Sequence, residues 1–166
     1  PVAARVREPV GEALVQLAET RSRVGVGNEE DVFVARATAG TYRDTLRDIP
    51  GVSFPLIPAT DRSTFKDFTI LVDPDPFALD ADGLSGALAA LGIETRRYYA
   101  PPVHAMRAYR TMNGAHGDLP VTQEMSAKVL TLPMWSEMTD AQVVQVSEGI
   151  RRIHQRVREN LRSPQH

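Results

Sequence analysis

The stretch FTILVDPDPFALDADGLSGALAALGIETRRYY, residues 68–99, contains the clearest order of secondary structure in the chain. Residues 68–72 are nearly continuous in apolar character, which is typical of a strand at the centre of a sheet. Asp80 precedes a helical pattern, and Gly92 fits the left-handed position that commonly ends a helix. The apolar positions of this helix are Leu84, Leu88 and Leu91. Residues 93–99 predict a strand, so the stretch reads as a strand–helix–strand unit.

Two helices are predicted upstream of this unit. The first lies near residues 9–18, with Pro9 suited to its first turn. Asn28 is a good N-cap for the second, which Pro50 and Gly51 end. The residues expected on the buried face of the second helix are Val32, Ala35, Ala39, Tyr42 and Leu46.

The remaining elements are one strand and two helices. Residues 52–57 are a β-rich run, and Pro55 places this strand at an edge because proline cannot donate a ladder hydrogen bond. Thr122 is a cap for a short helix that runs to about Val129. Residues 139–142, TDAQ, are a capping box that opens a long last helix. Its apolar stripe is Val143, Val146, Ile150, Ile153 and Val157.

These elements predict an α+β fold. Residues 52–57, 68–72 and 93–99 are expected to form a three-stranded sheet with helices packed largely on one face. The segment 100–117 is rich in Pro, Gly, His, Tyr and Met without clear periodicity, which is typical of a long ordered loop that carries function.

Composition excludes several classes of protein. With 42% hydrophobic and 24% charged residues among 166, the chain is in the ordinary range for one globular domain. No apolar run approaches the roughly 20 residues needed to cross a bilayer, and no secretory leader is evident, so we expect a cytoplasmic protein without membrane contact. The absence of cysteine excludes thiolate chemistry. A net charge of −2 argues against nucleic acid as a partner.

Four aspartates lie close together in the strand–helix–strand unit, Asp73, Asp75, Asp80 and Asp82. A calcium-binding loop of the EF-hand type also needs a glycine at its turn and a glutamate at its end, which are missing here. We therefore predict turn and cap roles for these aspartates rather than a metal site.

The sequence GIETRRYYAPPVH, residues 92–104, resembles a signature of the DegT/DnrJ/EryC1/StrS family of pyridoxal-phosphate-dependent sugar aminotransferases. The resemblance extends upstream to residues 41–54 and downstream to residues 117–150. It implies the small C-terminal domain of a fold-type I aminotransferase over residues 32–166. Residues 1–31 match poorly and are predicted to be a helical N-terminal segment.

In that family, the lysine that binds pyridoxal phosphate lies in a large domain that has no counterpart here. Transamination needs such an amine, and the chain offers only Lys66 and Lys128, both expected at the surface. We therefore expect no cofactor to be bound by this chain alone. Pyridoxal phosphate is implied for the complete enzyme, and the isolated chain is predicted to be inactive.

The resemblance also indicates substrate-binding residues. In the family, the Tyr-x-Pro-Pro-x-His turn lies at the mouth of the active site, which implies that Tyr98 or Tyr99 and His104 contact a sugar. The alternative is that one tyrosine anchors the core while the other is exposed, and that His104 caps a turn. Three further residues in the same loop are candidates for substrate or dimer contacts, namely Tyr109, Arg110 and His116.

The leading hypothesis is that the chain is the substrate-side domain of a sugar aminotransferase. The enzyme would transfer an amino group to a keto-sugar, often nucleotide-linked, only when a partner supplies the cofactor-binding domain. A homo-oligomer is expected. The alternative is a catalytically inactive interaction or regulatory module with the same fold, and an apolar patch along the first two helices would distinguish them. A DNA-binding regulator is a weaker third reading, which the net charge opposes.

Overall fold

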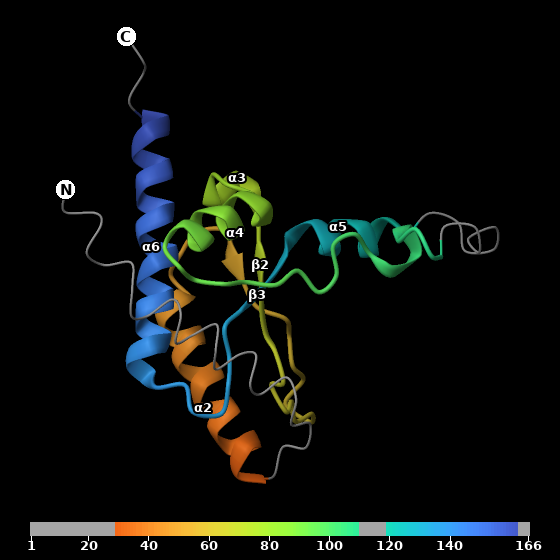
Figure 1. Ribbon diagram of the computed structural model, residues 1–166, viewed down its shortest axis with the longest axis vertical. Helices are drawn as coiled ribbons and strands as arrows, with labels where there is room; N and C mark the ends of the chain where they lie inside the picture. The colour runs from red at the N-terminus through yellow and green to blue at the C-terminus, as the bar shows by residue number, and fades with distance from the viewer. Residues whose placement is uncertain (1–28, 110–118, 163–166) are drawn as a thin grey trace.

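The structure is a computed structural model that describes residues 29–109 and 119–162 (Figure 1). The helix predicted near residues 9–18 and the Asn28 cap lie outside the described residues, as do Arg110 and His116. The elements, in chain order, are α2 (Glu29–Leu46), β1 (Val52–Ser53), β2 (Phe68–Val72), α3 (Pro74–Phe77), α4 (Ala81–Ala90), the 3-10 turn η1 (Val103–Ala105), α5 (Pro120–Lys128), β3 (Val129–Leu132) and α6 (Asp140–Arg162).

The sheet has three antiparallel strands in the order β1-β2-β3. In β2, Phe68, Ile70 and Val72 are buried, and alternate residues face the other way. Thr69 and Thr131 are paired on that second face, where their hydroxyl oxygens are 2.9 Å apart. The predicted central strand and the predicted α+β class are both confirmed.

The third strand is β3 and not residues 93–99, so that prediction was wrong. Residues 93–99 contain no strand and join the free edge of β3 by a single bridge, in which Arg96 and Thr131 exchange backbone hydrogen bonds of 3.0 and 2.8 Å. Both segments carry suitable β-forming residues, but β3 follows α5 directly and its LTL sequence is buried at 0–4% exposure. Burial in the core therefore selects β3 as the paired strand.

The first strand is much shorter than the predicted run 52–57. It ends at Ser53, two residues before Pro55, whose missing N–H cannot extend the ladder. Leu56 is 98% exposed, so no burial compensates for the lost pairing. The predicted edge position of this strand is confirmed, since β1 pairs only with β2.

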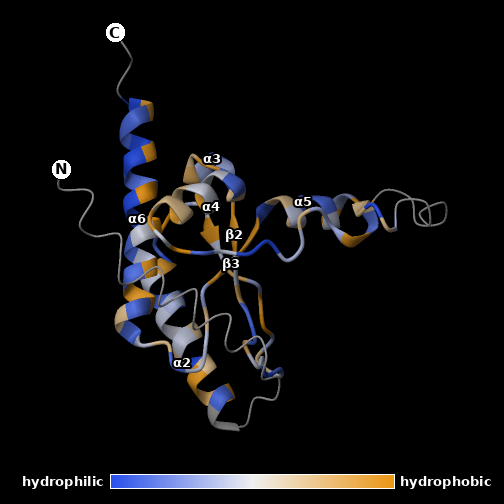
Figure 2. Ribbon diagram, viewed as in Figure 1, coloured by the Kyte–Doolittle hydropathy of each residue, from blue (hydrophilic) through white to orange (hydrophobic). Residues whose placement is uncertain are grey.

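Helices α2 and α6 lie side by side, and α4 contacts both α6 and β3, so the core is closed from one side of the sheet (Figure 1). Figure 2 shows hydrophobic and hydrophilic stretches alternating along α6, while the strands are mainly hydrophobic. Fully buried members of this core include Tyr42, Leu46, Leu84, Leu88 and Ile150. Leu91 is 56% exposed and therefore does not belong to the core face of α4.

Polar side chains cap the starts of α4 and α6, as predicted. Asp80 accepts a hydrogen bond from the Gly83 N–H at 2.7 Å. Asp73 caps α3, a short helix that was not predicted. The capping box before α6 forms, because the Thr139 N–H donates to Gln142 Oε1 at 2.9 Å and the Gln142 N–H to Thr139 Oγ1 at 3.3 Å. Helix α5 begins at Pro120, so the predicted Thr122 cap was wrong.

Helices α2, α4 and α6 and the sheet form the body of the molecule. Helix α5 and the segment around η1 project away from this body and are called the arm (Figure 1). The contacts of α5 to the body run through β2 and through β3, which it enters without a connecting loop. No helix in the described ranges is of a length and hydrophobicity that would cross a bilayer. The projecting arm places α5 and the turn after residue 99 next to each other.

Candidate functional site

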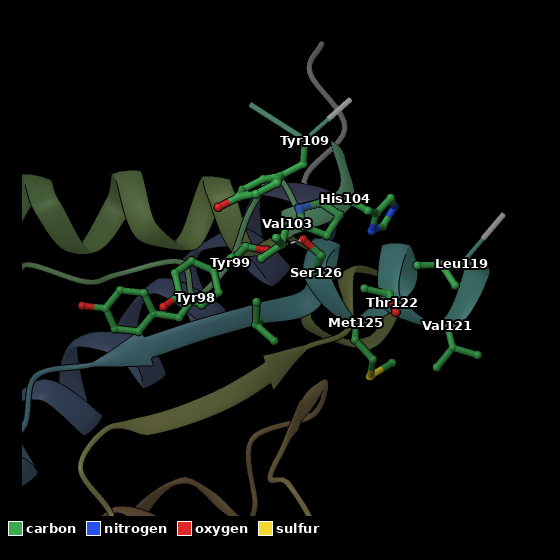
Figure 3. A pocket seen from close by; sticks show the side chains of 12 residues that line it. Tyr98, Tyr99, Val103, His104, Tyr109, Leu119, Val121, Thr122, Met125 and Ser126 are labelled. Carbon is green, nitrogen blue, oxygen red and sulfur yellow. Dashed lines mark hydrogen bonds between the residues drawn. The ribbon is translucent and has the colours of Figure 1, made fainter. Parts of the chain in front are cut away.

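A groove of about 930 Å³ lies between α5 and the segment that follows the bridge at Arg96. Its lining is mainly apolar and aromatic and includes all four substrate-binding residues predicted from the sequence, Tyr98, Tyr99, His104 and Tyr109. Figure 3 shows the three tyrosines on one side of the groove, Leu119, Val121 and Met125 on the other, and His104 between them. The four residues predicted from the Tyr-x-Pro-Pro-x-His segment and the loop after it therefore line the same groove.

The tyrosine wall of the groove is formed by a segment attached to the sheet. Backbone pairing of Arg96 with Thr131 holds its start against β3. Just before that bridge, the hydroxyls of Ser85 and Thr95 are 2.7 Å apart and tie the segment to α4. Tyr98 and Tyr99 follow immediately, so their backbone is held in place by contacts on two sides.

Neither tyrosine anchors the core. Tyr98 is 45% exposed and Tyr99 is 57% exposed, and their ring centroids lie 5.4 Å apart in a tilted arrangement. The alternative in which one of them is a core residue is therefore wrong. Two adjacent half-exposed phenol rings form a surface that is apolar on its faces and offers hydroxyls at its edge.

The upper rim of the groove is made by η1 and the residues after it. His104 lies in η1, which begins after Pro102, and its imidazole is partly buried. Tyr109 is 46% exposed and its backbone N–H bonds to the Met106 carbonyl at 2.9 Å. Both residues are therefore positioned by a local backbone turn that the Pro101–Pro102 pair introduces.

The opposite wall comes from α5, which the sequence analysis did not connect with the site. It contributes Val121, Thr122, Met125 and Ser126, and Leu119 lies directly before its first residue. Ser126 Oγ donates to the carbonyl oxygen of Tyr99 and so joins the two walls directly. The sequence signal for this wall was the apolar pair Val121 and Met125, four residues apart on a helix rich in polar residues; in the structure Val121 is 70% exposed.

Among the described residues, no arginine, lysine, aspartate or glutamate lines the groove. The site therefore suits an uncharged apolar or aromatic moiety bordered by hydroxyl groups, with Tyr, Thr and Ser hydroxyls and one imidazole as hydrogen-bonding groups. A phosphate group would find no cationic side chain among these lining residues.

The lysines do not fit pyridoxal phosphate as a resident cofactor. Lys66 is 89% exposed at its side chain and lies near Asp67. Lys128 donates to Glu124 at 2.8 Å, and this hydrogen bond raises the pKa of its ammonium group. A Schiff-base lysine must become neutral to attack, so the environment of Lys128 works against that role. Neither lysine lines the groove.

The predicted turn and cap roles of the aspartates are confirmed for Asp73 and Asp80. Asp82 forms an ion pair with Arg97 instead. Within the part of the chain that the structure describes, no group of three potential metal ligands is assembled.

Comparison with known proteins identifies the relatives of this fold. A sequence model of the DegT/DnrJ/EryC1/StrS aminotransferase family matches residues 28–151. The chain is 35% identical, over 68% of its length, to a dTDP-4-amino-4,6-dideoxy-D-glucose transaminase of Shigella dysenteriae, and it covers 30% of that protein. It is 28% identical to a dTDP-3-amino-3,4,6-trideoxy-alpha-D-glucose transaminase of Streptomyces venezuelae, over 73% of this chain and 30% of the relative.

Solved structures agree with the sequence comparisons. The crystal structure of DesI with its TDP-sugar product superimposes with a TM-score of 0.70 at 27% identity, over 78% of this chain and 33% of that one. A DegT DnrJ EryC1 StrS aminotransferase from Brucella abortus gives 0.63 at 30% identity, over 74% of this chain and 31% of that one. The chain therefore spans about a third of the length of these structures and 30% of the curated relatives. The chain therefore belongs to the DegT/DnrJ/EryC1/StrS aminotransferase family.

Proposed function

We propose that this chain is the substrate-side domain of a sugar aminotransferase and that its groove binds the sugar part of a nucleotide-linked keto-sugar. Transfer of the amino group then requires pyridoxal phosphate held by a cofactor-binding domain outside this chain. The observation that supports the proposal most directly is the convergence of Tyr98, Tyr99, His104 and Tyr109 on one groove.

The chemistry of the groove fits the proposed ligand. A pyranose ring has apolar C–H faces that pack on aromatic rings, and a ring of hydroxyls that need hydrogen-bond partners. Tyr98 and Tyr99 supply rings, and their hydroxyls, Thr122 and His104 supply polar groups. Among the described lining residues none is cationic, so we assign the diphosphate to a part of the complete enzyme outside this groove.

The role of each side chain is binding and orientation. Partly exposed aromatic rings exclude water from one face of the sugar when it binds, which strengthens the hydrogen bonds made at its edge. His104 is placed to hold or move a proton at a sugar hydroxyl through an imidazole nitrogen. The chemistry of amino-group transfer itself belongs to the cofactor and to its domain.

Family resemblance supports the proposal for the whole enzyme. The relatives named above are transaminases of dTDP-linked amino sugars, and another, in Acidithiobacillus ferrooxidans, is a UDP-N-acetyl-3-dehydro-alpha-D-glucosamine 3-aminotransferase at 30% identity. We infer a nucleotide-linked keto-sugar as the substrate class and assign the small domain to residues 32–166. A cytoplasmic homo-oligomer is part of the same proposal.

The alternative function, an inactive interaction module, is favoured by one observation. The groove leaves Val103 and Val121 exposed, at 49% and 70%, beside the half-exposed tyrosines. Such a surface also suits a protein partner. The leading hypothesis expects an apolar patch along the first two helices, where the domain would dock on a cofactor-binding domain. The first of these helices lies outside the described residues, and on the described part of α2 the large exposed apolar side chain is Phe33, at 74%, so α2 gives little support to that docking surface.

A titration of the ¹⁵N-labelled chain with dTDP-glucose, followed by NMR, tests the proposed function. We expect chemical-shift changes at Tyr98, Tyr99 and Tyr109 that saturate, and their loss in the Tyr99→Ala variant. The matched control is Phe33→Ala, an exposed aromatic on α2 that should bind as the wild type does. No saturable change at the groove would contradict the assignment of sugar binding to this site.

A further inference from the structure

One arginine behind the groove is connected to both of its walls. Arg97 immediately precedes Tyr98 and Tyr99, yet its side chain points away from the lining and is only 13% exposed. Its guanidinium donates to the carbonyl oxygens of Ser126 and Ala127 at 2.8 and 3.0 Å. Both carbonyls lie in the last turn of α5, which forms the opposite wall.

The contact satisfies two carbonyls at the end of a helix. The last four carbonyl oxygens of a helix have no intrahelical donor, and the C-terminal end carries partial negative charge. A guanidinium at that position neutralises the charge and supplies a planar fork of donors. Arg97 thus caps α5 from a segment that lies about 30 positions earlier in the chain.

A second contact fixes the direction of the same side chain. Nη1 of Arg97 forms an ion pair with Asp82, in the first turn of α4. Asp82 is 82% exposed, so this pair is weak as a source of stability. It nevertheless orients the guanidinium, because the two nitrogens of the fork are then held by partners on α4 and on α5.

The hydroxyl of Ser126 closes the arrangement on the side of the groove. It donates to the Tyr99 carbonyl, while the carbonyl of the same serine accepts from Arg97. Arg97, Ser126 and Tyr99 therefore form a continuous hydrogen-bonded link from one wall to the other. Arg97 Nε is buried and has no hydrogen-bond partner among the described residues.

We propose that Arg97 is a positioning residue that sets the separation of α5 from the Tyr98–Tyr99 wall and thereby the shape of the sugar-binding groove. The inference that this shape matters for sugar binding rests on the proposed function. The inference that Arg97 holds α5 in place is independent of the proposed function. Lysine cannot replace it fully, since a single ammonium group is a point donor and cannot match the fork between α4 and α5.

The test compares Arg97→Gln with Arg47→Gln, a surface arginine that pairs with one aspartate on α2. Methyl ¹³C resonances of the methionines report the walls without any ligand. We expect the Met125 resonance to shift and broaden in Arg97→Gln while that of Met138, in the core, stays in place. Arg47→Gln should leave both unchanged. An unchanged Met125 resonance in folded Arg97→Gln would overturn the proposal.

Ligand binding provides the second readout. The comparison is made once urea denaturation shows that the variants have equal unfolding midpoints. Arg97→Gln should then bind dTDP-glucose at least about tenfold more weakly than Arg47→Gln, and Arg97→Lys should have an intermediate affinity. If Arg97→Gln binds as tightly as Arg47→Gln, Arg97 does not affect sugar binding. A wild-type chain that does not bind dTDP-glucose counts against the proposed function, and the methyl resonances still decide the role of Arg97. If Arg97→Gln does not fold, Ser126→Ala breaks the same link and should move the Met125 resonance; no movement would contradict it.

Discussion

Tyr42 joins the core to the connection between β3 and α6. Its ring is fully buried and stacks on Phe68 at a centroid distance of 4.9 Å, and its hydroxyl donates to the Pro133 carbonyl at 2.8 Å. Burial raises the pKa of this phenol, so the hydroxyl remains a donor well into the alkaline range. A core tyrosine of this kind contributes both apolar area and a hydrogen bond.

The Tyr42→Phe substitution keeps the ring and removes the donor, and it leaves the Pro133 carbonyl without that partner. We expect the free energy of unfolding to fall by about 1–2 kcal/mol, measured by urea denaturation. Tyr98→Phe is the control, because the Tyr98 ring is half exposed and the change should leave stability as it was. Equal effects of the two changes would show that the Pro133 contact contributes nothing.

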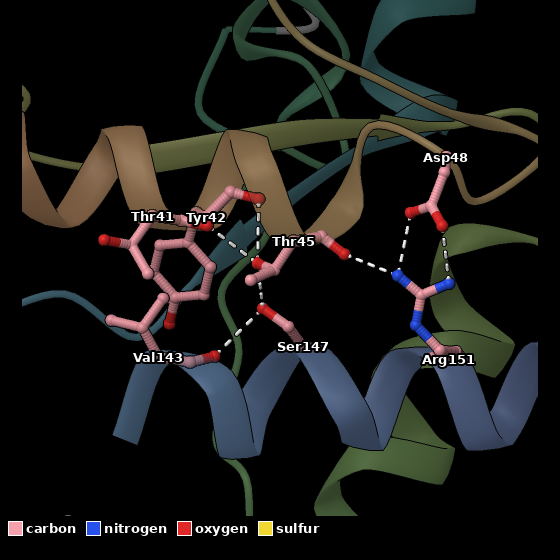
Figure 4. Close-up of polar contacts among 7 residues, drawn as sticks. All are labelled: Thr41, Tyr42, Thr45, Asp48, Val143, Ser147 and Arg151. Carbon is pink, nitrogen blue, oxygen red and sulfur yellow. Dashed lines mark hydrogen bonds and ion pairs between the residues drawn. The ribbon is translucent and has the colours of Figure 1, made fainter. Parts of the chain in front are cut away.

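Asp48 and Arg151 connect the end of α2 to α6 through paired hydrogen bonds of 3.0 and 2.7 Å (Figure 4). The same guanidinium donates to the Thr45 carbonyl at 2.7 Å. The hydrogen bond from Arg151 lowers the pKa of Asp48, although the carboxylate is exposed to solvent. The pair therefore links stability to pH in one direction.

Because the pKa of Asp48 is lower in the folded than in the unfolded chain, the pair stabilises the fold above the unfolded pKa of about 4. This contribution is lost as the pH falls through the lower folded pKa. We expect Asp48→Asn to lower the urea midpoint at pH 7 and to differ little from the wild type at the acidic limit of folding. A gap between the two proteins that widens on acidification would show that the sign is wrong.

Residue-level reasoning from the sequence found the aromatic wall of the groove but not the groove itself. Tyr98, Tyr99, His104 and Tyr109 lie within one stretch of chain, so a loop motif was sufficient to group them. Met125 and Ser126 are brought to the site only by the return of α5 toward β3. Arg97 was missed because its role depends on the ends of two helices that no local pattern connects.

At the scale of elements, the helices predicted within the described residues and the central strand agree well with the structure. Their signals were local, as for the Asp80 cap and the capping box at Thr139. The outer strand was misassigned because residues 93–99 and 129–132 both suit a strand, and the choice depends on which one α5 and the core place against β2. That competition is decided by tertiary packing, which a sequence window does not contain.

The turn between α2 and β1 provides an element-level prediction. Gly51 has a φ of 82°, and a Cβ there would lie 2.5 Å from the Phe77 backbone nitrogen and 2.8 Å from the Asp73 carbonyl oxygen. Gly51→Ala combines an unfavourable backbone conformation with a steric clash, so we expect a loss of at least about 2 kcal/mol in unfolding free energy.

The matched control for this turn is Gly86→Ala in the middle of α4. A Cβ at Gly86 meets no atom within 4 Å, so the change should stabilise the helix by about 0.5–1 kcal/mol. Urea denaturation of both variants should therefore give effects of opposite sign. Gly51→Ala with wild-type stability would mean that this turn tolerates a side chain.

At the scale of the whole molecule, the body and the arm have different tasks. The body, in which α2, α4 and α6 close over the sheet, contains the buried core and has no groove residue on its helices. The arm, made of α5 and the segment around η1, exposes apolar side chains to form the groove. The buried core thus belongs to the body, and the groove belongs to the arm.

The cofactor behaviour of the isolated chain follows from that division. Lys66 is almost fully exposed, and Lys128 is held protonated by Glu124 and Asp73, the hydrogen bond to Glu124 being the largest cause of its raised pKa. Neither amine lines the groove and both lie near carboxylates, so neither is suited to form an imine with pyridoxal phosphate. We therefore expect an equimolar mixture of the chain and pyridoxal phosphate to give the visible spectrum of free pyridoxal phosphate.

Borohydride treatment of the same mixture, followed by mass spectrometry, makes this prediction quantitative. Only trace modification is expected, spread over both lysines, and Lys66→Arg or Lys128→Arg should not change the spectrum. Stoichiometric trapping on one lysine would instead show that this chain forms the internal linkage to the cofactor by itself. In that case the transfer chemistry would lie in the chain, and the groove between α5 and the tyrosines would be its complete substrate site.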